Sequence, residues 1–232
     1  MLVEWNTNAQ GQKFVASYSG GKDSSLALYQ AMQMGEAVAL IVMLEEQGLK
    51  SRSHGMSLDI IHAQAKAIGL PIFTASATWQ EYESHFIQLL QKAQALGAET
   101  LVTGDIDLLA HAEWNQSVCD KNQLSLCMPL WQRPRLEIVQ EFISLGFQSI
   151  IVTVNLNLGM KVEDLGQVLT LDYIQQLVDR GIDPCGEAGE LHTTVIDGPI
   201  FQHALNIVKG DILYHENYAF LPLELEQHQI EG

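Results

Sequence analysis

Apolar runs and helix-like stretches alternate regularly along the first half of the chain. Continuous apolar runs are typical of strands buried on both faces of a parallel sheet. Stretches with apolar residues at helical spacing follow them and end at glycine. The pattern predicts strands at residues 14–18, 37–44, 72–75 and 100–103, and helices at 24–34, 57–68 and 81–96. This order predicts an α/β fold, a Rossmann-like parallel sheet with helices on both faces.

The second half has a different pattern. We expect helices at 136–145 and 172–180 around a strand at 149–154, and then strands at 190–197, 204–209 and 212–218. Short strands separated by Gly, Pro and Asp turns are typical of antiparallel sheet. We therefore expect a smaller C-terminal α+β domain, residues 126–232, that completes a substrate cleft on an ATP-binding domain, residues 1–125.

The stretch Ser19-Gly20-Gly21-Lys22-Asp23-Ser24 links the first predicted strand to the first predicted helix. Backbone N–H groups at a glycine turn and a helix N-terminus bind anions. Lys22 adds a mobile positive charge, Ser19, Ser24 and Ser25 add hydroxyl donors, and Asp23 suits a Mg²⁺ ion. The stretch predicts a phosphate-binding loop. The alternative is a plain glycine turn in which Asp23 and Ser24 cap the helix.

The spacing of this loop decides which kind of phosphate loop it resembles. A Walker-type loop needs a glycine at the position of Ala16, so that match fails. The Ser-Gly-Gly-x-Asp-Ser order is similar, residue for residue, to the PP-loop ATP pyrophosphatases. This resemblance implies a HUP-type fold and cleavage of ATP between its α- and β-phosphates to adenylate an oxygen.

Composition narrows the class of protein. The 232 residues are 47% apolar and 17% charged, which is typical of a packed globule. No apolar run is long enough to span a membrane. The net charge of −16 disfavours a nucleic-acid surface. Cys119, Cys127 and Cys185 form no C-x-x-C pair, which suits a reducing cytoplasm and opposes a zinc ribbon.

Candidate chemistry also follows two later predicted strands. Gly104-Asp105-Ile106-Asp107 follows the fourth, at the edge where the phosphate loop opens, so Asp105 is a second candidate for holding Mg²⁺ or the nucleotide. A helix cap is the equal alternative. Ser53-His54-Gly55 follows the second strand, and a lone histidine there is more often an ordinary loop residue.

The densest motif runs from Asp183 to Thr193 and is followed by Asp197-Gly198-Pro199. Glu187 and Glu190 stand three apart among glycines, as candidates for acid–base chemistry or ammonium binding. His192 is placed to point into the same cleft. The alternative is a glycine-rich hairpin with solvated carboxylates. Cys185 is a weaker candidate, since buried structural cysteine is commoner than a nucleophile without an assigned base.

With these motifs the chain resembles the diphthine–ammonia ligase family over nearly its whole length. The shared motifs are Ser19–Ser24, Ser53-His54-Gly55, Gly104-Asp105-Ile106 with His111 and Trp114, Pro129-Leu130-Trp131, and Asp183–Thr193 with Asp197-Gly198-Pro199. The chain differs from the family pattern at Ala112, Gln167, Ala188 and Leu191, each of which replaces a group that could contact the acceptor.

The resemblance implies an amide-forming ligase that uses ATP and Mg²⁺. A carboxylate acceptor of open identity would be adenylated and then joined to ammonia or an amine, with Lys22, Glu187, Glu190 and His192 as catalytic residues. A homodimer is expected for an enzyme of this size. Two alternatives remain: a PP-loop tRNA-modifying enzyme, and an ATP-binding regulatory module without turnover.

Overall fold

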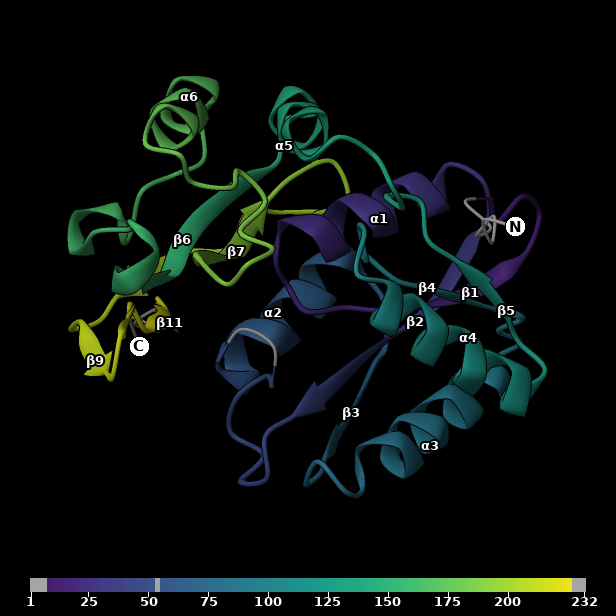
Figure 1. Ribbon diagram of the computed structural model, residues 1–232. Helices are drawn as coiled ribbons and strands as arrows, with labels where there is room; N and C mark the ends of the chain where they lie inside the picture. Colours follow the sequence, from purple (N-terminus) through teal and green to yellow (C-terminus); the bar gives the residue numbers. More distant parts are fainter. Residues whose placement is uncertain (1–7, 53–54, 227–232) are drawn as a thin grey trace, which may run out of the picture.

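The computed structural model describes residues 8–52 and 55–226. Its first half is a five-stranded parallel sheet in the order β3-β2-β1-β4-β5, which confirms the predicted α/β class (Figure 1). The strands are β1 (Lys13–Ser17), β2 (Glu36–Leu44), β3 (Ile72–Ser76), β4 (Thr100–Val102) and β5 (Ser125–Cys127). The helices between them are α1 (Lys22–Met32), α2 (Leu58–Ile68), α3 (Tyr82–Gln94) and α4 (Leu109–Asn122).

Alternation along the strands divides the core into two layers. In β1, Phe14 and Ala16 face the layer that contains α1 and α2, whereas Val15 faces the layer that contains α3 and α4. Successive strand residues point to opposite faces, so a strand apolar at every position is covered on both sides. Helices therefore cover both faces of the sheet, as the sequence predicts.

The second half contains an antiparallel sheet in the order β7-β6-β10-β9, which confirms the expected change of architecture. Its strands are β6 (Gln148–Asn155), β7 (Leu191–Asp197), β9 (Leu213–His215) and β10 (Tyr218–Phe220), and β8 (Ile207–Lys209) pairs separately with β11 (Leu223–Leu225). The remaining elements are α5 (Arg135–Ser144), η1 (Leu156–Leu158), η2 (Val162–Asp164) and α6 (Leu171–Asp179).

The two sheets share one core layer. The cluster that covers α1 and α2 continues through Phe147, Ile151 and Val195 of the second half. The expected boundary at residues 125–126 falls inside β5 and stays a prediction. No helix in the described ranges is long and apolar enough to cross a membrane.

Some elements differ from the sequence expectations. The strand expected at 212–218 is wrong, because the chain turns at Glu216, whose φ is +50°, and forms the β9–β10 hairpin. The strand expected at 204–209 begins only at Ile207. The sequence pattern also missed α4, β5 and β11.

Candidate functional site

The phosphate loop between β1 and α1 has the strand–turn–helix geometry that the sequence predicts. Gly20 has a φ of +80°, which L side chains rarely adopt, and a Cβ there would collide with Gln64 and Met56. Ser19 Oγ donates to Ser24 Oγ at 3.0 Å, and Ser24 Oγ donates to the Gly21 carbonyl at 3.1 Å. Ser25 is fully buried and pairs with the Tyr18 hydroxyl at 3.2 Å, so it lies behind the loop.

The second sheet holds this loop in place. The Gly20 carbonyl accepts from the backbone N–H of Val195 at 3.0 Å and from Gln64 Nε2 at 2.9 Å. Gln64 Nε2 also donates to the Val195 carbonyl at 2.7 Å. The backbone N–H of Lys22 donates to Thr193 Oγ1 at 3.2 Å. Strand β7, from the second half of the chain, is therefore part of the phosphate-loop structure.

Lys22 differs from the expectation of a mobile charge. Its side chain is buried, pairs with Asp23 Oδ2 at 2.7 Å and donates to the Cys185 carbonyl. Burial alone would lower the pKa of Lys22, but the charge and hydrogen bond of Asp23, together with the weaker effects of Cys185 and Glu187, raise it. Lys22 is therefore a fixed cation that joins the phosphate loop to the loop before β7.

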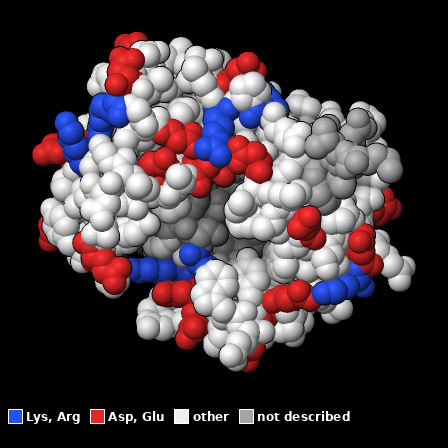
Figure 2. Space-filling model, in the orientation of Figure 1, with Lys and Arg blue, Asp and Glu red and all other residues white. Residues whose placement is uncertain are grey.

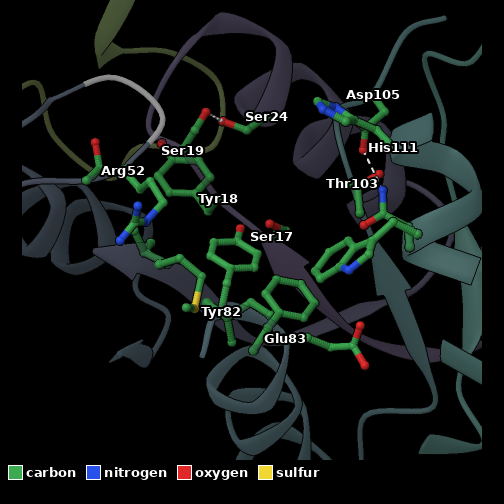
Figure 3. A pocket seen from close by; sticks show the side chains of 18 of the residues that line it. Ser17, Tyr18, Ser19, Ser24, Arg52, Tyr82, Glu83, Thr103, Asp105 and His111 are labelled. Carbon is green, nitrogen blue, oxygen red and sulfur yellow. Dashed lines mark hydrogen bonds and ion pairs between the residues drawn. The ribbon is translucent and has the colours of Figure 1, made fainter. Parts of the chain in front are cut away.

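A cavity of about 770 Å³ opens beside the phosphate loop at the carboxyl ends of the parallel strands. Figure 2 shows a hollow in this face of the molecule, with acidic and basic side chains gathered along its border. Figure 3 shows Arg52 and His111 at opposite sides of the pocket, with Tyr18 and Tyr82 between them. Six of the predicted site residues line it: Ser19, Asp23, Ser24, Gly104, Asp105 and Glu187.

Six other predicted site residues do not line the cavity: Gly20, Gly21, Lys22, Ser25, Glu190 and His192. Glu190 is buried, and its Oε2 accepts the backbone N–H of Ala188 at 3.0 Å. Burial and the charge of Lys22 lower the pKa of His192 to about 4, so this imidazole is neutral at pH 7. Neither residue therefore reaches the cavity in this structure, and Glu190 instead bonds to the backbone of the Glu187 loop.

The rim after β4 combines a close backbone contact with an Asp–His pair. A Cβ on Gly104 would lie 2.9 Å from the Asp23 carbonyl carbon, so glycine lets β4 approach α1. Asp105 accepts from Asn115 Nδ2 at 2.8 Å and pairs with His111 Nδ1 at 3.1 Å. Burial alone would raise the pKa of Asp105, but these hydrogen bonds lower it, and the bond to Asp105 raises the pKa of His111. The cap alternative is wrong, because Leu108 is the N-cap of α4 and no side chain caps that helix.

The loop before β7 carries Glu187 to the cavity border. Asp183 Oδ2 accepts the backbone N–H of Glu187 at 3.1 Å, and Asp183 Oδ1 accepts that of Cys185 at 3.0 Å. Partial burial of the carboxyl group and the nearby charge of Asp23 raise the pKa of Glu187 to about 7. Burial likewise raises the pKa of the Cys185 thiol, which opposes a nucleophilic role for it.

The sequence pattern missed several cavity residues. Tyr82 and Trp114 form an aromatic wall with ring centroids 5.5 Å apart, and the Arg52 guanidinium lies 4.5 Å from the Trp79 ring centroid. Arg52 directly precedes Ser53-His54-Gly55, of which Ser53 and His54 lie outside the described residues. These side chains come from loops and helices that only the fold brings together.

The departures from the family pattern lie mostly away from the cavity. Ala112 and Leu191 are buried in the hydrophobic core, and Gln167 donates to the Glu163 carbonyl on the surface. None of these three lines the cavity, and the expectation that they bear on acceptor contacts stays a prediction. Ala188 is exposed beside Glu187.

Asp23 fits a Mg²⁺ ion better than Asp105 does. Asp23 Oδ1 is buried without a hydrogen-bond partner and belongs to a cavity residue, whereas both oxygens of Asp105 are already engaged. The described part of the chain holds no cluster of three or more metal-ligating side chains. Mg²⁺ is often held by one or two carboxylates together with substrate phosphates.

Models of a known protein family match both halves of the chain. The family model of the diphthamide synthase N-terminal domain matches residues 12–126, and that of the C-terminal domain matches residues 134–228. The diphthine–ammonia ligase of Danio rerio is 22% identical, over 91% of this chain and 92% of its own length. That of Homo sapiens is 26% identical, over 91% of this chain and 88% of its own length.

Two further proteins show the range of similarity. The diphthine–ammonia ligase of Saccharomyces cerevisiae is 28% identical over 85% of this chain, which spans 35% of the yeast protein. A solved "predicted subunit of tRNA methyltransferase" from Methanocaldococcus jannaschii has a TM-score of 0.42 and 17% identity, over 81% of this chain and 98% of that one. The two domain matches together cover both the phosphate loop and the Glu187 loop, and the chain belongs to the diphthamide synthase family.

Proposed function

We propose that this chain is an ATP-dependent, AMP-forming carbon–nitrogen ligase similar to diphthine–ammonia ligase. It adenylates a carboxylate acceptor, with release of pyrophosphate, and then transfers ammonia or an amine to the activated carboxyl group. The observation that carries the proposal is the junction of two loops at one cavity. Strand β7 bonds to the phosphate loop through Val195 and Thr193, and the loop before β7 brings Glu187 to the same cavity.

ATP binds with its phosphates at the Ser19–Ser24 loop and its nucleoside in the cavity. The loop offers backbone N–H groups at the start of α1, where the helix dipole favours negative charge. The cavity volume of about 770 Å³ lies in the usual range for a small-molecule site. The aromatic wall of Tyr82 and Trp114 supplies apolar area for a flat ring system.

Asp23 would hold Mg²⁺, through the carboxylate oxygen that has no other hydrogen-bond partner. A bound Mg²⁺ neutralises negative charge on the phosphate oxygens. Asp105, whose oxygens bond to His111 and Asn115, fixes the β4 rim and is the weaker ligand candidate. Lys22 supplies a second positive charge at the base of the same loop.

Adenylation begins when an acceptor carboxylate oxygen attacks the α-phosphorus. The new P–O bond forms as the bond to the β-phosphate bridging oxygen breaks, so pyrophosphate leaves with the bonding electrons. Preorganised donors stabilise this developing charge without reorganising at the moment of reaction. The loop amides, Ser19, Ser24 and the charge of Lys22 are the groups of this chain that do so.

Amide formation follows at the same carbon. The nitrogen of ammonia attacks the acyl carbon, the bond to the AMP oxygen breaks, and the nitrogen loses a proton. Glu187 lines the cavity, and its pKa of about 7 lets its carboxylate accept that proton near neutral pH. Glu190 keeps the Glu187 loop in shape through the Ala188 N–H.

The tRNA-thiolase alternative fits the site less well. Thiolation needs reactive cysteine, whereas Cys119, Cys127 and Cys185 are all buried. Burial raises the pKa of Cys119 and of Cys127 to about 12, so neither is a thiolate at neutral pH.

A product assay tests the proposal. The protein is incubated with ATP, MgCl₂, ammonium chloride and a translocation factor that carries diphthine, and nucleotides and acceptor mass are measured. AMP, pyrophosphate and the amide are expected in equal amounts, and formation of ADP and phosphate would contradict the scheme. Glu187→Gln should slow amide formation roughly 10²- to 10⁴-fold while it keeps ATP binding. The exposed α5 residue Glu137, changed to Gln, is the matched control.

A further inference from the structure

Arg135, the first residue of α5, joins the two loops that border the cavity from the β4 and β7 sides. Its Nε and Nη2 donate to the two carboxylate oxygens of Asp107, each at 2.9 Å. Its Nη1 donates to Asp183 Oδ2 at 2.5 Å. Asp107 belongs to the loop after β4, and Asp183 to the loop that carries Glu187. One planar guanidinium therefore fixes the separation of the two loops.

Asp183 transmits this contact to Glu187. The same Asp183 Oδ2 that receives the arginine accepts the Glu187 backbone N–H at 3.1 Å, while Oδ1 accepts that of Cys185. Its side chain is only 13% exposed, so few waters can replace the arginine there. Removal of Arg135 would leave a carboxylate that is free to turn and would release the backbone that presents Glu187.

Cys185 closes a second connection between Arg135 and the phosphate loop. Its Sγ donates to the Arg135 carbonyl at 3.2 Å, and its own carbonyl accepts from Lys22 Nζ. Lys22 pairs in turn with Asp23. Arg135 is thus connected through both its side chain and its backbone to the loop that presents Glu187, and through Cys185 to the phosphate loop.

Stability alone does not account for this arrangement. The Arg135 and Asp107 side chains are 36% and 40% exposed, and ion pairs that exposed contribute about 0–1 kcal/mol. The bidentate geometry also fixes the orientation of the guanidinium relative to the Asp107 carboxylate. Arg135 thereby fixes the relative position of two loops whose aspartates, Asp107 and Asp183, lie 28 and 48 residues from it in sequence.

We propose that Arg135 is a positioning residue for the amide-forming step. It holds the Asp183–Glu187 loop at the distance from the β4 rim and the phosphate loop that directs the Glu187 carboxylate to the incoming amine. This inference rests on the proposed function, because it assigns Arg135 a task in that reaction. Arg135 itself does not line the cavity.

The test compares Arg135→Gln, Arg135→Lys and the control Arg133→Gln. Arg133 is two residues away and forms a similar half-exposed pair with Glu141 at 2.5 Å, without a cavity loop as partner. Amide formation is measured against ammonium concentration with Mg-ATP and the diphthine-bearing translocation factor. Arg135→Gln should lower kcat/KM for ammonium roughly 10- to 100-fold, the scale of a small misplacement of a reacting group. KM for ATP should change less than about twofold, because the phosphate-loop contacts remain.

A double-variant cycle separates positioning of Glu187 from a general structural effect. If Arg135 acts through Glu187, Arg135→Gln adds no further loss in a Glu187→Gln background. Arg135→Lys should recover part of the rate, because lysine can keep one of the two ion pairs. If Arg135→Gln fails to fold, Arg135→Lys takes its place in the comparison with Arg133→Gln.

The outcomes are distinct. A rate loss equal to that of Arg133→Gln, or a loss that multiplies with that of Glu187→Gln, would overturn the role of Arg135. Absence of AMP and amide with the unmodified chain would overturn the proposed function instead. Normal rates for Glu187→Gln with reduced rates for Arg135→Gln would overturn the coupling between the two residues.

Discussion

Gly104→Ala tests whether the close contact of β4 with α1 shapes the phosphate site. The added Cβ would lie 2.9 Å from both the Asp23 carbonyl carbon and the Ser24 nitrogen, and 3.0 Å from the Asp23 carbonyl oxygen. All three atoms are backbone, so no side chain can rotate away, and the rim and the helix N-terminus must separate. Such overpacking costs about 1–3 kcal/mol.

The cost can appear in two measurements. Where the strain stays in the folded protein, urea unfolding reports it as a lower free energy of unfolding. Where the rim moves away, it appears as weaker ATP binding by calorimetry, and 1–3 kcal/mol corresponds to roughly 5- to 150-fold in Kd. We expect the two effects together to reach this range.

Gly210→Ala is the matched control. A Cβ at Gly210 would meet its nearest atom, the Pro222 carbonyl oxygen, at an ordinary 3.4 Å. Neither glycine has a positive φ, so both changes restrict the unfolded chain alike and this contribution cancels in the comparison. If Gly104→Ala matched the control within about 0.5 kcal/mol and bound ATP equally well, the steric reasoning would be refuted.

Three more predictions address charge and reactivity. The rate of amide formation per free ammonia should rise through about pH 7 and then level off, since Glu187 accepts a proton only above its raised pKa, and Glu187→Gln should lose this inflection in a pH–rate profile. Asp164→Asn should lower the free energy of unfolding by about 1–3 kcal/mol at pH 7, because it weakens bonds from Arg180 at 2.7 and 2.8 Å and from Tyr173 at 2.5 Å. Hydrogen bonds from Arg180 keep the pKa of Asp164 low despite burial. The contribution of Asp164 to the free energy of unfolding is therefore present above the ordinary pKa of 3.8 and is lost as pH falls through the lowered pKa. Urea unfolding curves of the unmodified chain and of Asp164→Asn should converge in acid. The buried thiols of Cys119, Cys127 and Cys185 should react with iodoacetamide only as fast as the protein unfolds, as measured by mass spectrometry. Rapid labelling of the folded protein would contradict their burial.

The sequence could predict elements whose local pattern agrees with their tertiary role. β2 is apolar along most of its length and lies between β1 and β3, and α2 begins at the capping residue Ser57 and ends at Gly69 with a φ of +83°. α4 lacks a clear apolar stripe, since its sequence mixes polar and apolar residues around the helix, and periodicity therefore missed it. The β9–β10 turn uses Glu216 where a glycine or asparagine signal is usual.

The residues of the candidate site likewise include some that the sequence could predict and others that only the fold reveals. The phosphate loop and the Glu187 motif are contiguous in sequence, so residue type and spacing were enough to single them out. Arg135 carries no motif, and its meaning comes from Asp107 and Asp183, which only the fold brings to it. Lys22 donates to the backbone carbonyl of Cys185, and a pattern of side chains in the sequence cannot predict a contact with a backbone group.

The site depends on both halves of the chain at the level of backbone hydrogen bonds. The Gly20 carbonyl of the phosphate loop is satisfied by Val195 N–H and by Gln64, and the first amide of α1 by Thr193. A buried backbone group that loses its partner costs about 1–3 kcal/mol. A chain without β7 and the loop before it would expose these groups and would lose the Cys185 carbonyl that holds Lys22. The Ser19–Ser24 loop and the loop that carries Glu187 therefore depend on each other for their structure, and in the proposed mechanism this couples ATP binding to the amide-forming step.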